Sequence, residues 1–110
     1  MSVRLFWLES TEGHLHCVPM ENAAQCTTLM NLITCPLASI SRNIIPVPYE
    51  NRTLRAFVFL LRAPDKEALL YLKRHDMEHE ALILTLANWL ECRRVISLIA
   101  WITASRIHGK

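Results

Sequence analysis

Glycine is scarce in this chain of 110 residues, where only Gly13 and Gly109 occur. A loop that cradles phosphate groups is usually rich in glycine, because its backbone must approach the ligand closely. The sharp glycine-flanked turn that presents a nucleophilic serine or cysteine in many hydrolases is missing as well. These absences remove two common catalytic frameworks. We therefore predict that the chain is not an enzyme and uses no cofactor.

An excess of charge of one sign is also lacking. The formal net charge is +2 with the histidines neutral, which is too small to indicate a nucleic acid or an anionic membrane as the partner. The longest apolar run, from Val95 to Ala104, is well short of the ~20 residues that a membrane-spanning helix needs. We expect neither nucleic acid nor membrane among the partners.

The cysteines lack the C-x-x-C spacing that is typical of zinc and redox sites. No secretory signal follows Met1, so free thiols in a protein of the cytoplasm and nucleus are expected. Hydrophobic residues make up 52% of the chain, a high share for the single small domain that we assign to residues 1–110. Part of the apolar surface is therefore a candidate interface rather than core.

Strands are predicted in the first half of the chain only. Val3–Leu8 and Leu15–Val18 predict a hairpin around a turn that closes on Gly13. Ile44–Pro48 is extended, because each proline disfavours a helical conformation in the residue before it. Its two prolines also restrict this strand to the edge of a sheet. The expected sheet is small and three-stranded.

Helices dominate the second half. Asp76 is the strongest predicted N-cap, because acidic Glu78 and Glu80 follow in the first turn, where the helix dipole favours negative charge. A break is expected at Cys92–Arg94. Separate strands and helices of this kind predict an α+β fold with helices packed on the sheet. Helices are predicted over Met20–Cys26, from Thr27 or Thr28, from an N-cap at Asn51 to Pro64, from Asp65, from Asp76, and from Val95 to His108.

A possible zinc motif, H-x-x-E-H, occurs at His75–His79. It would need both imidazoles on one helical face, a third ligand, and Glu78 as the base for a bound water. Asp76 as N-cap instead places His75 outside the helix, and no third ligand stands at a suitable spacing. A second cluster of His14, His16 and Cys17 fails because adjacent strand residues point to opposite faces. We predict solvated histidines and no metal site.

Leucines at four-residue spacing, Leu82, Leu86 and Leu90, predict the core face of the helix after Asp76. Trp89 and Trp101 lie beside such faces rather than on them. Tryptophans that are half exposed are enriched in binding hot spots. Two interpretations stay open for each tryptophan: a contact residue at the surface, or a fully buried core residue.

The segment Leu86–Cys92, Leu-Ala-Asn-Trp-Leu-Glu-Cys, resembles the signature helix of the Skp and elongin C families. Those proteins carry Ala-Asn, an aromatic residue, Leu and an acid at the same places, and elongin C has a cysteine where Cys92 stands. Residues Ala87–Lys110 align with the Skp family without a gap and end in the shared Gly-Lys. Further similar segments, in the same order along the chain, are Val3-Arg4-Leu5, Thr28-Leu29 with Leu32-Ile33, and Ile45-Pro46-Val47-Pro48.

The resemblance implies a BTB/POZ fold and an adaptor that joins a cullin to a substrate receptor in a ubiquitin ligase. Carried over by position, Asn88 and Trp89 would face the cullin. Leu98, Trp101 and Ile102 of the last helix would help to seat an F-box or a SOCS/elongin-box-like receptor.

Two departures from the Skp family keep other readings open. The family's acidic loop is replaced by Leu37–Asn43, and the chain stops at Lys110 where Skp proteins continue into further helices. The alternatives are a divergent BTB-fold scaffold subunit in a transcription or centromere assembly, and a BTB homodimer. Without a partner, the adaptor is expected to self-associate through the uncovered side of its last helix.

Overall fold

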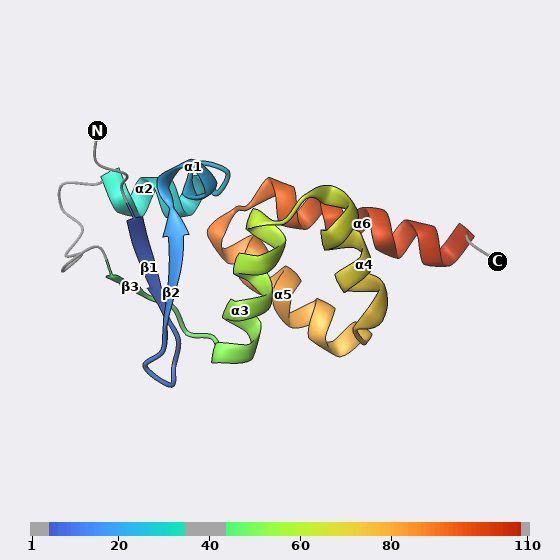
Figure 1. Ribbon diagram of the computed structural model, residues 1–110, viewed down its shortest axis with the longest axis horizontal. Coiled ribbons are helices and arrows are strands. Elements are labelled where there is room, and N and C mark those ends of the chain that lie inside the picture. The colour runs from blue at the N-terminus through green and yellow to red at the C-terminus, as the bar shows by residue number, and fades with distance from the viewer. Residues whose placement is uncertain (1–4, 35–43, 109–110) are drawn as a thin grey trace.

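A small sheet and a set of helices occupy the two ends of the elongated molecule, whose extents are 49 × 30 × 21 Å (Figure 1). The computed structural model describes residues 5–34 and 44–108. Within these residues the elements are β1 (Leu5–Glu9), β2 (Leu15–Pro19), α1 (Met20–Ala23), α2 (Thr27–Thr34), β3 (Ile44–Pro46), α3 (Asn51–Arg62), α4 (Asp65–Arg74), α5 (Met77–Leu90) and α6 (Arg93–His108). The predicted α+β class is confirmed.

The sheet has the order β2-β1-β3, antiparallel between β1 and β2 and parallel between β1 and β3. The predicted hairpin is confirmed, with Leu5 opposite Pro19 and Glu9 opposite Leu15. Its turn uses Gly13 at a φ of 82°, a left-handed conformation that glycine adopts at little cost. Strand β3 lies at the edge, as its prolines predict, but it ends at Pro46 rather than Pro48.

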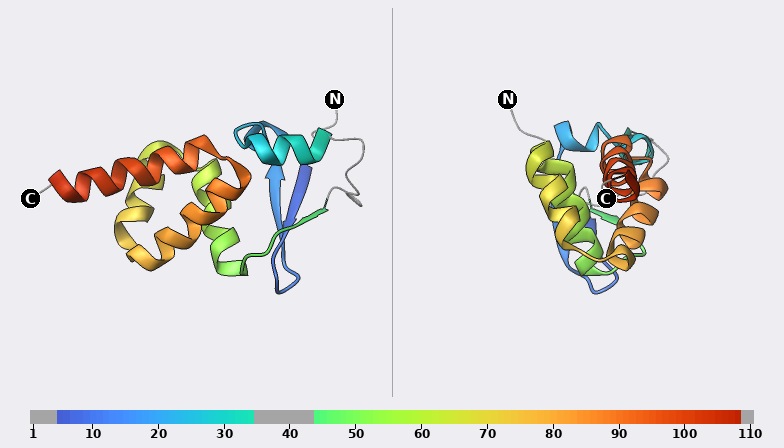
Figure 2. Two further views of the ribbon diagram at one scale, coloured as in Figure 1. Left: turned by 180° about the vertical axis from the view of Figure 1, so that it is seen from behind. Right: turned by 90° about the vertical axis from the view of Figure 1, so that its right-hand side faces the viewer.

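The helices pack on one another and on the sheet. Helix α3 contacts both β2 and α5, and α6 contacts α4 and α5. Helix α2 lies across one end of the strands, and α6 extends beyond the other helices (Figure 2). One hydrophobic core unites the two ends; it includes Leu8, Val18, Leu54, Phe57, Ile83, Leu86, Leu90, Val95, Ile99 and Ile102.

The prediction that Leu82 belongs to this core is wrong, because 49% of the residue is exposed. A spacing of four residues advances about 40° past a full helical turn. The face of α5 that is buried carries His79, Ile83, Leu86 and Leu90. Leu82 therefore lies outside the buried face.

A helix begins where the sequence predicts when its N-cap bonds to a residue close by in the chain. Asp76 is the N-cap of α5, and its carboxylate accepts a hydrogen bond from the His79 N–H at 2.8 Å. The predicted cap at Asn51 is wrong: Glu50 occupies the cap position, and Asn51 is the first residue of α3. The expected break before the last helix falls at Glu91, and α6 begins two residues before Val95.

Some predicted features lie outside the described residues. These are the first residues of the predicted hairpin, Val3 and Arg4, the loop over Leu37–Asn43 and the helix stop at Gly109. Among the residues that are described, none of the helices combines the length and the apolar character needed to cross a membrane.

Candidate partner-binding surfaces

The first candidate surface lies at the C-terminal end of α5, where Asn88 and Trp89 are both exposed. Trp89 keeps 43% of its area accessible. Its ring lies 6.3 Å from the ring of Tyr49, inclined by 55°, a tilted geometry that aromatic pairs favour. Trp89 is therefore supported on one side and open on the other. The alternative that it is a fully buried core residue is excluded.

The turn after α5 fixes the direction of this surface. Glu91 adopts a left-handed conformation with φ 53° and ψ 48°. Its N–H donates to the carbonyl of Asn88 at 3.1 Å, and the next N–H, of Cys92, donates to the carbonyl of Ala87 at 2.8 Å. These bonds satisfy carbonyls that a helix end leaves free. Asn88 and Trp89 thus belong to a last helical turn whose free carbonyls are capped by backbone hydrogen bonds.

The second candidate surface is a groove of about 510 Å³ between α4 and α6. Trp101 forms an exposed apolar wall of it, with 56% of its area accessible. Leu69 and Leu98 provide further apolar lining, and Asp65, Arg94 and Ser97 complete it. For Trp101 too, full burial is excluded.

Arg94 makes one end of this groove rigid. Its Nη1 lies 2.7 Å from Oδ1 of Asp65, which forms an ion pair. Its Nε donates to the carbonyl of Leu60 at 3.3 Å, and its Nη2 donates to the carbonyl of Ala63. A single guanidinium thereby satisfies free carbonyls at the end of α3 and anchors the start of α4. Because Arg94 donates its hydrogen bonds to groups of the same chain, we assign it a structural role: it holds the two helices that form the groove in position.

The three residues assigned to receptor binding are not equivalent. Trp101 is exposed, and Leu98 is largely buried but lines the groove. Ile102 is fully buried in the core. The expectation that Ile102 offers surface to a receptor is therefore corrected: it points into the core of the chain, where it supports α6 from behind.

The histidines of the H-x-x-E-H motif pack around Tyr71. Nδ1 of His75 donates to the Tyr71 carbonyl at 2.8 Å, and the two rings stack at 4.0 Å. The His79 ring lies 5.0 Å from that of His75, and its Nε2 is 3.1 Å from the Tyr71 hydroxyl. Only 2% of His79 is exposed, so the prediction of solvated histidines is wrong for it.

The electrostatics of His79 follow from this burial. Burial lowers its pKa, and electrostatic interactions with Arg52 and His75 lower the pKa further, while Asp76 and Glu80 act in the opposite direction. Nδ1 of the ring is buried and has no hydrogen-bond partner among the described residues. The neutral ring is therefore the form that the fold favours. In the part of the chain that the structure describes, no three His, Cys, Asp or Glu side chains are grouped so that they could hold a metal ion.

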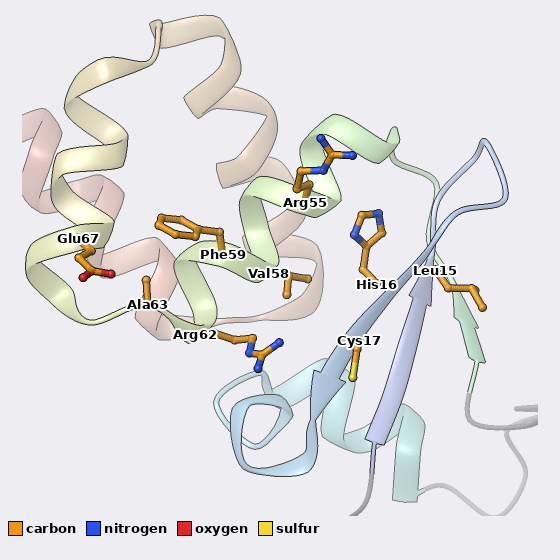
Figure 3. A pocket seen from close by; sticks show the side chains of 9 residues that line it. All are labelled: Leu15, His16, Cys17, Arg55, Val58, Phe59, Arg62, Ala63 and Glu67. Atoms are coloured by element: carbon orange, nitrogen blue, oxygen red, sulfur yellow. The ribbon is translucent and has the colours of Figure 1, made fainter.

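A third hollow, of about 580 Å³, lies between β2 and α3 (Figure 3). The strand contributes His16 and Cys17, and the helix contributes Arg55, Phe59 and Arg62 among others. Sequence patterns missed this cleft, because its walls are distant in the chain and each wall looks like an ordinary exposed face. A contact of 2.5 Å between His16 Nε2 and Asn51 Oδ1 joins β2 to the start of α3 beside this hollow.

No protein-family model and no curated protein matches this sequence. The resemblance to the Skp and elongin C families thus depends on the similar segments described above.

Proposed function

We propose that the chain is a non-catalytic adaptor of the Skp and elongin C kind, with a BTB/POZ fold, which joins a cullin to an F-box or SOCS/elongin-box-like receptor. One observation supports this most directly: two tryptophans, Trp89 and Trp101, are exposed on separate surfaces of one small chain. Burying apolar area stabilises a complex by about 25 cal/mol per Å², and tryptophan is enriched in hot spots. An adaptor needs two such surfaces.

The surface around Trp89 is proposed to bind the cullin. The Trp89 ring lies in a tilted pair with that of Tyr49, a contact that would restrict the ring before a partner binds. Pre-ordered side chains lose less conformational entropy on binding. Exposed Asn88 supplies a hydrogen-bonding amide beside the ring. This pair is also where the resemblance assigns cullin contact.

The groove between α4 and α6 is proposed to bind the receptor. Its apolar wall is formed by two helices, which suits an amphipathic helix laid along it. Leu69, Leu98 and Trp101 would contact that helix, and buried Ile102 would hold α6 in place behind them. The proposed location of such a complex is the cytoplasm and nucleus.

Two alternatives use the same surfaces for other partners. A divergent BTB-fold scaffold of a transcription or centromere assembly would bind different proteins at Trp89 and Trp101. A homodimer would bury one of these surfaces against a second copy. Neither alternative requires a cullin.

Affinity purification of the tagged chain from cells, followed by mass spectrometry, tests the proposal. We expect a cullin and at least one box-containing receptor to be recovered together. Leu70→Ala, which removes an exposed leucine of α4 that does not line the groove, is the matched control and should recover the same proteins. Recovery of transcription or centromere proteins without a cullin, or of the chain alone, would overturn the ubiquitin-ligase proposal.

A further inference from the structure

Two buried cysteines face each other where the turn before α2 meets the turn before α6. Cys26 immediately precedes α2, and Cys92 immediately precedes α6. Both are free thiols and both are fully buried. They are the paired residues of an isolated antiparallel β-bridge. This bridge joins the sheet end of the molecule to the helical end.

The hydrogen bonding of the bridge defines how close the pair is. The N–H of Thr27 donates to the carbonyl of Glu91 at 3.2 Å. This bond joins the residue after Cys26 to the residue before Cys92, so the cysteines form a non-hydrogen-bonded antiparallel pair. Such pairs have their Cα atoms about 4.5 Å apart and their side chains closest. A disulfide needs a Cα separation of about 4.4–6.8 Å, so the backbone already holds the pair within range.

The surroundings make one of the two thiols the better nucleophile. The hydrogen bond from the Cys26 thiol lowers the pKa of Cys92, and so do the backbone N–H groups of Val95 and Arg94 at the start of α6, against the raising effect of burial. The same hydrogen bond, followed by burial, raises the pKa of Cys26. Thiolates form preferentially at helix N-termini and beside cations. Cys92 is thus the attacking residue and Cys26 the resolving one.

We propose that Cys26 and Cys92 are a latent dithiol site that glutathione disulfide converts to an intramolecular disulfide. The Cys92 thiolate attacks one sulfur of glutathione disulfide, its S–S bond breaks, and one glutathione thiolate leaves. Cys26 then gives up its proton and attacks the Cys92 sulfur, which releases the second glutathione. Two protein thiols are oxidised by two electrons, and one glutathione disulfide is reduced to two glutathione thiols.

Burial sets the conditions of this reaction. Since both sulfurs are fully buried, the oxidant reaches them only when the junction opens locally. Such an opening breaks the hydrogen bond of 2.8 Å from the Thr28 hydroxyl to the Glu91 carboxylate, which spans the junction. The bond that forms then ties this junction shut. Cys92, one of its two ends, lies two residues after the last residue of α5, the helix that carries Trp89.

The test uses the full chain with Cys17 and Cys35 changed to serine, so that only Cys26 and Cys92 carry thiols. The reduced protein is incubated under native conditions with glutathione disulfide, remaining thiols are alkylated, and the intact mass is measured. We expect the protein to lose about 2 Da, to carry no bound glutathione and to take up no alkylating reagent. Its melting temperature should rise, and dithiothreitol should reverse that rise. Adding Cys26→Ser should leave Cys92, which stops at the mixed disulfide with glutathione. Adding Cys92→Ser should leave Cys26, which should react much more slowly, because the attacking thiol is then gone.

The result that would overturn the proposal is equally specific. Native protein that keeps both thiols alkylatable, or that carries two glutathiones, would show that the pair does not close. A disulfide that forms only in denaturant would also contradict it, since the native bridge would then have no part in the reaction. The wild-type chain serves as the check on the variant, and should yield the same Cys26–Cys92 linkage in fragmentation spectra.

Discussion

The carboxylate of Glu80 lies 2.5 Å from the guanidinium of Arg106, from α5 to α6. Glu80 is buried and Arg106 is partly exposed. The same Nη2 of Arg106 donates to the carbonyl of Leu72 at 3.0 Å. One cation therefore links three helices, α4, α5 and α6, beneath the part of α6 that extends away from the core.

Arg106→Met tests this link. The substitution leaves the Glu80 carboxylate buried without its counter-charge, which typically costs about 3 kcal/mol or more of unfolding free energy. Urea denaturation measures the loss. Arg93→Met, which removes an exposed arginine of the same helix, should cost well under that amount, and adding Glu80→Gln to Arg106→Met should recover part of it. Equal losses for the two single variants would contradict a specific role for the pair.

His79 should make the stability depend on pH. Its pKa in the folded chain lies below the ordinary value of 6.5, so the unfolded chain binds more protons once the pH falls below about that value. The free energy of unfolding should therefore decrease on acidification, by at most about 1.4 kcal/mol per pH unit from this residue. Denaturant unfolding at about pH 7.5 and about pH 5.5 measures the decrease.

His79→Gln is the informative variant, because glutamine keeps a polar group near the Tyr71 hydroxyl but does not titrate. Its stability should depend less on pH than that of the wild type. His14→Gln changes an exposed histidine and should keep the wild-type dependence. If His79→Gln retains the full dependence, another group is responsible.

The parts of the fold that were predictable depend on local chemistry. Asp76 caps α5 through a bond to a residue three positions on, and prolines mark β3 as an edge strand wherever it pairs. Asn51 failed as a cap because distant residues use it: its N–H donates to the Glu12 carboxylate at 2.6 Å, and its side chain contacts His16. The left-handed residue that ends α5 could not be predicted, because it is Glu91 rather than the glycine that usually occupies such a position.

The candidate surfaces were predictable only in part. The sequence placed Trp89 and Trp101 beside the core faces of their helices but left burial open, because exposure depends on which neighbouring helix covers each ring. The groove exists because α4 lies beside α6, and Arg94 binds groups on α3 and α4. Ile102 was assigned by its position in the resemblance, which carries no information on burial, and the structure places it on the covered side of α6.

Trp89→Ala separates binding from stability. Because the ring is partly exposed, the change should lower stability by less than the roughly 3–5 kcal/mol of a core tryptophan. It should weaken cullin binding by about 2 kcal/mol or more, as truncation of a hot spot does. Calorimetric titration and a thermal melt give the two numbers, with Leu70→Ala on α4 as control. A large fall in melting temperature with unchanged affinity would show that Trp89 does not contact the cullin.

Trp101→Ala tests the groove in the absence of a receptor. The exposed apolar wall should drive the isolated chain to self-associate at high concentration, since apolar area in water is unfavourable. Analytical ultracentrifugation should show association for the wild type and for Leu70→Ala, an exposed leucine outside the groove, and a monomer for Trp101→Ala. A wild-type chain that stays monomeric at every concentration would remove this support.

The central claim is that one chain holds a cullin and a receptor at once, and reconstitution tests it most directly. The chain is mixed with the cullin and the receptor box recovered by affinity purification, and light scattering after size exclusion gives the mass of the complex. We predict a 1:1:1 complex, loss of the cullin alone with Trp89→Ala, and loss of the receptor alone with Trp101→Ala. Failure of the wild type to hold both partners together, or loss of both partners with either variant, would contradict the account.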